Sequence, residues 1–355
     1  MYNVGWKPVV NNFNVPSARI RCLNIINHFH SDRIVLELFN PDNFTDRYDA
    51  VIFSKTYTDE SIAQAEALKQ KGKIVILDMF DNRFFDSDGY GGTAHTEAQL
   101  RKMCALADYI TTSTNFLKDA LLAHMPGRQI TPIEDALEET LYTEDYTITE
   151  RLTAYAAWLR YRLQLQHTAV QKTRLIWFGT SGNERHGTGM ADLLKIRGLL
   201  EKPAFKDHVI LTICSKGKRI YRELFSDWNI PTLYITWHAA TFYRVLRLNH
   251  IALIPVTVNP LTLYKTNNRV ITALHNNLAV IADGIPSYQE FSECIALDNW
   301  EEGLRRYIKD PAYRQQCIDK GKIIIQTRYT PEHIADRWRS YLTEILETPK
   351  QRFAS

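Results

Sequence analysis

The chain lacks long apolar runs and a strong excess of either charge. No apolar stretch in its 355 residues approaches the roughly 20 residues that cross a bilayer, and the opening segment MYNVGWKPVV has no signal-peptide core. Its 43 lysines and arginines nearly balance its 40 aspartates and glutamates, so the formal net charge is +3. This balance gives no reason to expect a nucleic-acid partner or a polybasic membrane arm. We expect a cytoplasmic protein with at most peripheral membrane association.

Cysteine is scarce and scattered. The five cysteines are an odd number, and none belongs to a C-x-x-C pair; they are Cys22, Cys104, Cys214, Cys294 and Cys317. Such spacing does not indicate a disulfide framework or a metal site, and it favours a reducing compartment. We therefore expect a protein without a bound metal or a resident cofactor.

Repeats of solenoid length and low-complexity segments are also missing. The remaining composition is that of a globular protein, with 45% hydrophobic and 23% charged residues. This supply of apolar side chains is enough for two cores, and the length of the chain favours two domains over one.

Apolar runs and helical patterns alternate along the chain. In the first half the predicted strands are 49–55, 74–80 and 109–114, and the predicted helices are 58–70, 95–106 and 115–125, the last capped by Thr114. A long helical pattern follows within 138–173. The second half has predicted strands at 174–179, 208–216, 233–237, 251–256 and 278–283, and three helical patterns follow residue 299. Alternation of this kind predicts two doubly wound α/β domains with parallel sheets.

The predicted domain boundaries follow from this pattern. An N-terminal domain is expected at 1–150, a linker helix at 151–173, a second domain at 174–330, and a final helix with a tail at 331–355. In doubly wound sheets the ligand crevice lies outside the carboxyl ends of the strands, so chemistry is expected just after each strand.

Two glycine-containing turns follow strands of the second domain. Gly179 ends the strand 174–179, and the segment TSGNERHGTG after it provides Gly182 and the basic Arg185. The spacing matches neither G-x-G-x-x-G nor a Walker A motif. A glycine-rich turn without a ligand is at least as probable an interpretation as a phosphate loop. Ser215 and Lys216 end the next strand and face the expected crevice.

A pair of cations stands at the start of a later helix. Lys265 and Arg269 lie where the helix dipole is already positive, which is unfavourable unless an anion shares the site. We expect Thr266 to cap this helix and the two cations to bind a diphosphate. The alternative is two ordinary surface cations.

Polar residues also follow the most buried strand of the first domain. Asp81 is the candidate acid, base or electrostatic group, and its alternative role is to cap the turn that leads into Asn82. Spacing alone does not decide whether Arg19 and Arg21, after the first strand, face the crevice or solvent.

These segments resemble the GT-B glycosyltransferases of family 4, also called glycosyl transferases group 1. The resemblance rests on ADYITTSTNFLKDALL, on RLIWFGTSGNERHG and on NNRVITALHNNLAVIADGIPSYQEF. The variant K-S/T-N-N-R, present here at 265–269, and the segment IVILDMFDN resemble a sub-group from bacterial surface-polysaccharide gene clusters. The resemblance implies two Rossmann-like domains that face a central cleft, with a C-terminal helix that crosses back.

This sequence departs from the family pattern at several positions. The two family glutamates, spaced eight apart, align with Tyr264 and Thr272, and the family histidine aligns with Phe80. The usual arginine after the first donor-domain strand is replaced by Thr180, and its lysine partner falls near Arg185. The fold is therefore the firmer expectation and the activity the weaker one.

The leading hypothesis is metal-independent transfer of a hexosyl-type sugar, with retention, from a nucleotide-diphosphate donor to a hydroxyl acceptor. The donor is expected to be UDP- or GDP-linked, and the acceptor a glycan or lipid-linked glycan in polysaccharide or glycoconjugate synthesis. Asp81, Lys265 and Arg269 are the expected catalytic residues. The expected donor-binding residues are Gly179, Thr180, Ser181, Gly182, Arg185, Ser215, Lys216, Lys265, Thr266, Asn268, Arg269 and Thr272. The alternatives are a sugar-nucleotide epimerase and a catalytically reduced nucleotide- or carbohydrate-binding subunit.

Overall fold

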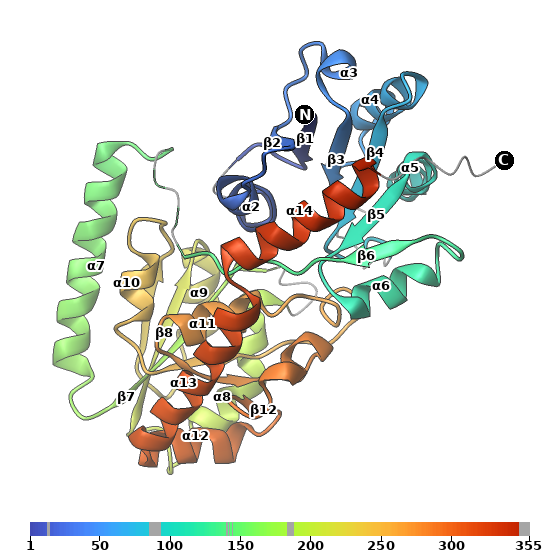
Figure 1. The fold of residues 1–355 in the computed structure, drawn as a ribbon. Coiled ribbons are helices and arrows are strands. Elements are labelled where there is room, and N and C mark those ends of the chain that lie inside the picture. Colours follow the sequence, from blue (N-terminus) through green and yellow to red (C-terminus); the bar gives the residue numbers. More distant parts are fainter. Residues whose placement is uncertain are drawn as a thin grey trace. The chain divides into compact units, whose positions relative to one another are not determined.

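The chain forms two compact units. The first unit consists of Met1–Glu139, Leu263–Thr266 and Thr327–Ser355, and the second of Thr140–Thr262 and Asn267–Gln326. The computed structural model describes residues 1–12, 15–84, 94–139, 141, 143, 145–182 and 188–347. Each unit is an α/β structure built on a parallel sheet (Figure 1).

The sheet of the first unit has the strand order β2-β1-β3-β4-β5-β6, and every described pairing in it is parallel. Its strands are β1 (Tyr2–Pro8), β2 (Ile34–Leu38), β3 (Ala50–Ser54), β4 (Ile74–Met79), β5 (Tyr109–Thr112) and β6 (Ile130–Pro132). All residues of β3 and β4 are buried, as expected for strands that are covered on both faces. The strands predicted at 49–55, 74–80 and 109–114 are therefore present.

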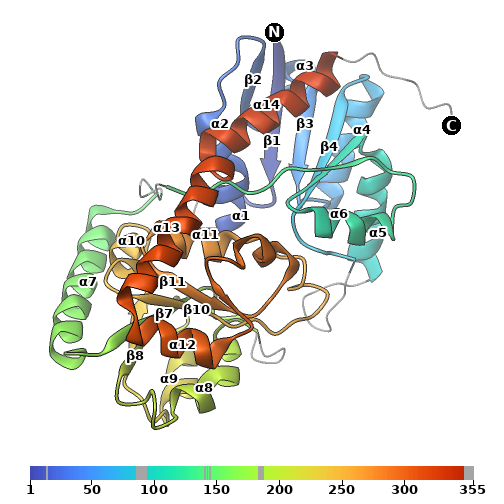
Figure 2. The ribbon, with the colours of Figure 1, turned by 60° about the horizontal axis from the view of Figure 1, so that its bottom comes forward.

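Helices cover both faces of this sheet. The helices of the first unit are α1 (Pro16–Ala18), the π-helix Arg19–Leu23, α2 (Asn24–His28), α3 (Phe44–Arg47), α4 (Asp59–Gln70), α5 (Ala94–Leu106), α6 (Asn115–Leu122) and α14 (Pro331–Glu347). Helices α2 and α14 pack on one face (Figure 2). The ring centroids of Trp6 and Trp338 lie 4.6 Å apart there. Helices α4, α5 and α6 pack on the other face. Thr114 caps α6 as predicted, because its hydroxyl accepts a hydrogen bond from the Leu117 amide.

A buried ion pair lies under α14. The Asp78 carboxylate of β4 is fully buried and accepts hydrogen bonds from Arg21 Nη2 at 2.7 Å, Ser54 Oγ at 2.7 Å and Thr111 Oγ1 at 2.8 Å. The Arg21 guanidinium also lies 5.3 Å from the ring centroid of Trp338. Arg21 therefore points into the protein interior beside the sheet, whereas its sequence position left open whether it faces the crevice or solvent.

The second sheet has the strand order β12-β11-β10-β7-β8-β9, again with parallel pairings. Its strands are β7 (Thr173–Phe178), β8 (Val209–Ser215), β9 (Thr232–Thr236), β10 (Ile251–Ile254), β11 (Ala279–Ala282) and β12 (Ala296–Leu297). The short strand β12 was not predicted, because its two residues carry no alternation or apolar run of useful length.

The helices of the second unit are α7 (Ile148–Thr168), the 3-10 helix Gly189–Leu193, α8 (Leu194–Leu200), α9 (Lys218–Phe225), α10 (Phe242–Leu246), α11 (Asn268–His275), the 3-10 helix Pro286–Phe291, α12 (Trp300–Lys309) and α13 (Pro311–Arg328). Side chains of α8, α9, α12 and α13 form one core with β7, β8, β10 and β11. The three helices predicted after residue 299 are α12, α13 and α14.

Helix α7 belongs to the second unit as a packed element. It begins at a capping box formed by Thr147 and Glu150. This start lies within the helical pattern of 138–173 and shortly before the predicted linker helix at 151–173. The Tyr161 hydroxyl lies 2.9 Å from Thr212 Oγ1 and accepts a hydrogen bond of 3.0 Å from Asn249 Nδ2. These bonds attach α7 to β8 and to the segment after α10 within the second unit.

Replacing Asp78 by asparagine should lower the free energy of unfolding by about 3 kcal/mol or more, because Arg21 then stays buried with Asp135, 3.3 Å away, as its remaining carboxylate partner. Chemical unfolding at neutral pH measures this change. The matched control is Asp46→Asn, which removes an exposed carboxylate 3.7 Å from Lys71 and should change stability by less than about 0.5 kcal/mol. Equal losses in the two variants would contradict a central role for the buried pair.

Candidate functional site

The order of the second sheet reverses between β7 and β10. Strands β8 and β9 follow β7 on one side, whereas β11 and β12 follow β10 on the other. Loops that leave such a switch point diverge to opposite faces of the sheet and leave a crevice between them. The segments after β7 and β10 are therefore the natural place for a ligand in this unit.

The loop after β7 is closed at its base by two glycines. Gly182 and Gly189 both have a φ of +78°. A Cβ on Gly182 would lie 2.0 Å from the Thr188 carbonyl oxygen, and a Cβ on Gly189 would lie 2.5 Å from the Gly182 Cα. A side chain at either position is therefore excluded by space as well as by backbone conformation. A third glycine, Gly217 after β8, packs against Ser181, because a Cβ there would lie 2.5 Å from the serine Cβ.

Two aspartates tie the loops of this edge together. Asp192 accepts hydrogen bonds from the amides of Gly189 at 2.9 Å and Thr257 at 2.8 Å, so it joins the segments that follow β7 and β10. Asp283, after β11, accepts from the Val256 amide at 2.8 Å and from Lys195 Nζ at 2.7 Å. Both carboxylates are therefore used within the protein, where they join the segments that follow β7, β10 and β11.

Arg269 is the most informative side chain of this edge. Its guanidinium carbon lies 5.5 Å from the ring centroid of the buried Trp177. Its Nε and Nη2 atoms are enclosed, and neither has a hydrogen-bond partner among the described residues. Burial lowers the pKa of Arg269, which Tyr288 and Asp192 partly offset. Arg269 as a whole is partly exposed, but two enclosed and unused donors on a guanidinium are costly unless a ligand supplies the acceptors.

The other expected donor-binding residues differ in exposure. Thr180 and Lys216 are exposed, and the Lys216 ammonium lies 5.1 Å from the ring centroid of Trp237. Ser215 is fully buried, and its hydroxyl accepts a bond from the Gly217 amide at 3.4 Å. Arg185 lies outside the described residues.

The helix that carries Arg269 begins differently from the prediction. We expected Thr266 to cap it, but the N-cap is Asn267, without a side-chain capping bond, and α11 begins at Asn268. The Asn267 amide nitrogen Nδ2 instead donates to Glu290 Oε1 at 2.7 Å. Thr272, the position of the second family glutamate, lies one turn further along α11 and is partly buried.

Sequence reasoning missed two residues of this edge. Tyr288 is buried and close enough to Arg269 for their charges to interact, and Glu290 holds Asn267. Both follow β11 in the segment GIPSYQEF. The only signal in the sequence was their place just after a strand, at the carboxyl end where ligand-binding residues gather.

In the first unit, a second charged cluster lies at the carboxyl ends of β3 and β4. The Asp81 carboxylate forms ion pairs with Lys55 and with Lys265, and it is almost fully buried. Lys55 has a left-handed backbone with a φ of 52°, a conformation that costs a non-glycine residue about 1 kcal/mol or more. Burial lowers the pKa of Lys55, and the charge of Asp81 partly restores it.

The two lysines decide the protonation of Asp81. Burial alone would raise the pKa of this carboxyl, but the charges of Lys265 and Lys55 outweigh it and bring the pKa to about 2. Asp81 is therefore an ionised carboxylate at neutral pH and a weak base. This setting fits an electrostatic role better than proton transfer.

Lys265 and Arg269 have separate surroundings. The segment Leu263–Thr266 belongs to the first unit, where Lys265 contacts Asp81, and Arg269 belongs to the second, where it lies over Trp177. Two of the three expected catalytic residues, Asp81 and Lys265, are thus in direct contact.

Neither a protein-family model nor a curated protein matches the chain by sequence. Solved structures do match in fold. OtsA in its apo form gives a TM-score of 0.64 at 11% identity, covering 98% of this chain and 100% of that chain. An α,α-trehalose-6-phosphate synthase from Burkholderia multivorans gives 0.59 at 10% identity, with 97% and 98% covered. S. aureus TarM in complex with fondaparinux, α-GlcNAc-glycerol and UDP gives 0.59 at 11% identity, with 84% and 56% covered.

The chain has the GT-B fold. Two parallel six-stranded sheets with helices on both faces are the features that it shares with these structures. Identities of 10–11% show the fold alone, so the membership in family 4 that the sequence suggested stays a prediction.

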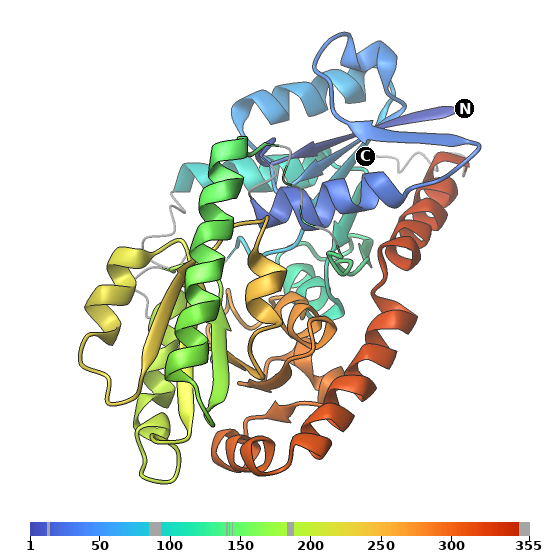
Figure 3. The same ribbon diagram turned by 90° about the vertical axis from the view of Figure 1, so that its left-hand side faces the viewer.

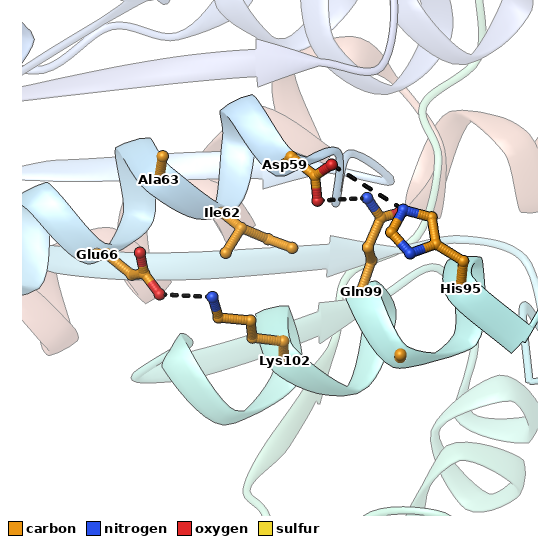
Figure 4. A pocket seen from close by; sticks show the side chains of 8 residues that line it. Asp59, Ile62, Ala63, Glu66, His95, Gln99 and Lys102 are labelled. Carbon is orange, nitrogen blue, oxygen red and sulfur yellow. Dashed lines mark hydrogen bonds and ion pairs between the residues drawn. The ribbon is translucent and has the colours of Figure 1, made fainter.

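The GT-B chain has one further groove, on the outer surface of its first unit between α4 and α5 (Figure 4). Its volume is about 300 Å³, and its charged walls are already paired, Glu66 with Lys102 at 2.8 Å and Asp59 with Gln99 at 2.7 Å. This groove is not at the strand ends, and its polar side chains already bind one another. We therefore give it no part in the site.

Two searches of the described residues gave negative results. No group of three or more histidine, cysteine, aspartate or glutamate side chains is arranged to hold a metal ion. No described helix is both long enough and apolar enough to cross a membrane.

Replacing Asp81 by asparagine should lower the free energy of unfolding by about 1–3 kcal/mol at neutral pH, because Lys55 and Lys265 then repel each other without a carboxylate between them. The pKa of Asp81 is about 2 in the folded chain, against an ordinary value of 3.8. Its contribution to stability is therefore present above about pH 4 and is lost as the pH falls towards 2. Urea unfolding of both proteins between pH 7 and pH 3 measures this convergence.

The matched control is Asp119→Asn, which removes an exposed carboxylate of α6 in the same unit and should be nearly silent. If Asp81→Asn is as stable as the parent at pH 7, the ion pairs do not hold this edge together.

Proposed function

We propose that this protein is a glycosyltransferase that moves a sugar from a nucleotide-diphosphate donor to a hydroxyl acceptor. The fold is compatible with this activity, and the TarM complex contains UDP. The feature that carries the proposal is the enclosed guanidinium of Arg269, whose Nε and Nη2 have no acceptor among the described residues. It lies at the switch point of the second sheet, beside the glycine-closed loop after β7.

A bound diphosphate supplies the hydrogen-bond acceptors that Arg269 Nε and Nη2 lack among the described residues. Phosphate oxygens accept two parallel hydrogen bonds from a guanidinium, and their negative charge offsets the cost of burying the cation. The N-terminus of α11 and the amides of residues 180–182 offer further donors at the same edge. As the bond from sugar to phosphate breaks, charge builds on the leaving diphosphate, and fixed donors stabilise it without a metal ion.

In the first unit, Asp81 and its two lysines are proposed to meet the transferred sugar or the acceptor. Because Asp81 stays ionised, its proposed role is to stabilise positive charge that develops at the anomeric carbon. The proposal includes transfer with retention of configuration from a hexosyl donor linked to UDP or GDP. The proposed acceptor is a glycan or lipid-linked glycan in bacterial polysaccharide synthesis. The proposed site of action is the cytoplasm.

A second candidate is a nucleotide- or carbohydrate-binding subunit that has lost catalysis. One observation favours it, because the Asp81 carboxylate already forms ion pairs with Lys55 and Lys265. Donor turnover separates the two candidates. Release of nucleoside diphosphate from UDP- or GDP-sugars in the presence of a saccharide acceptor supports the transferase, and binding without release supports the subunit.

Replacing Arg269 by methionine should weaken the binding of UDP or GDP by about 10- to 100-fold, the scale of one or two charge-assisted hydrogen bonds. The melting temperature of the unliganded variant should stay equal or rise, because the change removes an enclosed cation without acceptors. Isothermal titration calorimetry and thermal unfolding measure the two effects.

The control is Arg222→Met, which removes an exposed cation of α9 in the same unit and should leave both quantities unchanged. Normal nucleotide binding by Arg269→Met together with a lower melting temperature would show that Arg269 is structural, and the proposal would lose its main support.

A further inference from the structure

Helix α7 exposes an apolar stripe that no described residue covers. Five large apolar side chains on its outer side are exposed: Ile148 (74%), Leu152 (63%), Tyr155 (38%), Leu159 (49%) and Leu163 (48%). Their spacing of three and four residues places them within an arc of about 80°, since successive helical residues are about 100° apart. Isolated apolar residues on a surface are ordinary, but a continuous stripe along one helix is not.

This stripe is separate from the face by which α7 packs on its own unit. Ala154, Tyr161 and Leu165 are the buried residues of the helix, and they lie about 140° around the helix from the stripe. Packing in the fold therefore explains one apolar face of α7 and leaves the second without a partner. Figure 3 shows this helix in green, beside α10.

Positive charge borders the stripe on both sides. Arg160 lies on one side, and Arg151 and Arg162 lie on the other. Arg244 of α10 adds a fourth cation, 5.4 Å from the ring centroid of Tyr155. The single acidic residue of α7, Glu150, points away from the stripe and is bound in the capping box with Thr147.

We propose that α7 lays this stripe on the surface of an anionic lipid bilayer. An apolar helix face bordered by arginines buries its side chains at the level of the acyl boundary, while the guanidinium groups meet the negative headgroups. Trp158, half-buried next to Arg162 and Arg244, is the kind of aromatic residue that favours the interfacial region. The inference goes beyond sugar transfer and does not depend on it.

The same charges argue against a second copy of this chain as the occupant. A two-fold contact between α7 helices would bring Arg151, Arg160 and Arg162 of each copy against the other, and α7 itself contains one acidic residue, Glu150, to pair with them. Like charges next to an apolar seam oppose association. An anionic bilayer both buries the apolar side chains of the stripe and pairs its headgroups with the arginines beside it.

Sedimentation of the full chain with lipid vesicles tests the proposal. The chain should bind vesicles of equimolar phosphatidylcholine and phosphatidylglycerol, should bind pure phosphatidylcholine more weakly, and should be released by salt. The double variant Leu159→Gln/Leu163→Gln should reduce the partition coefficient on the anionic vesicles by at least about tenfold. Arg160→Glu should reduce it by about fivefold or more on anionic vesicles and little on neutral ones.

The matched control is Leu194→Gln/Ile323→Gln, which changes two leucine-sized side chains of similar exposure, 43% and 62%, on other helices of the same unit. This control should bind vesicles as the parent does. The melting temperatures of both double variants should equal that of the parent, because exposed side chains contribute little to folding.

Three results would overturn the proposal. The first is a parent chain that does not bind anionic vesicles, and the second is a control variant that loses binding as much as the stripe variant. The third is evidence that protein already covers the stripe. Such evidence is either a dimeric parent that becomes monomeric by light scattering in Leu159→Gln/Leu163→Gln, or a clearly lower melting temperature of this stripe variant. None of these readouts requires nucleotide or sugar, so they are independent of the transferase proposal.

Discussion

Parallel strand order is the constraint on which the rest of this structure depends. Because the strands of each sheet all run the same way, the segments that follow the strands all leave from the same edge. The glycine-closed loop after β7, the aspartates that join neighbouring loops and the enclosed Arg269 meet there for this reason. In the first unit the same constraint brings Lys55 and Asp81, which end adjacent strands, into contact.

The sequence was informative where local chemistry decides the structure. Continuous apolar runs identified β4 and β11, and Thr114 was recognised as a cap because its hydroxyl acts on an amide three residues away. Side-chain partners far apart in the chain were not accessible in this way. Lys265 pairs with Asp81, a residue 184 positions earlier, and Asn267, the N-cap of α11 in place of the expected Thr266, donates to Glu290. Such contacts depend on tertiary packing, which periodicity and capping rules do not contain.

The two candidate clusters differ in how the charge at their centre is balanced. Arg269 is a cation held without an acceptor among the described residues, so its enclosure is a cost that a bound anion would remove. Asp81 has two cationic partners and is satisfied before any ligand arrives. A ligand that separates Lys265 from Asp81 must replace that ion pair, whereas a ligand at Arg269 displaces nothing. The second unit is therefore the better prepared of the two for a tightly bound anion.

The discontinuous first unit has a consequence for how the chain folds as it is made. The core of its sheet includes Trp6 of the first strand and Trp338 of α14, so residues from both ends of the sequence are needed to close it. During translation the second unit, nearly continuous from Thr140 to Gln326, is complete before α14 has emerged. Until then this face of the N-terminal sheet has α2 but not α14 to cover it, so part of its apolar surface stays exposed during synthesis.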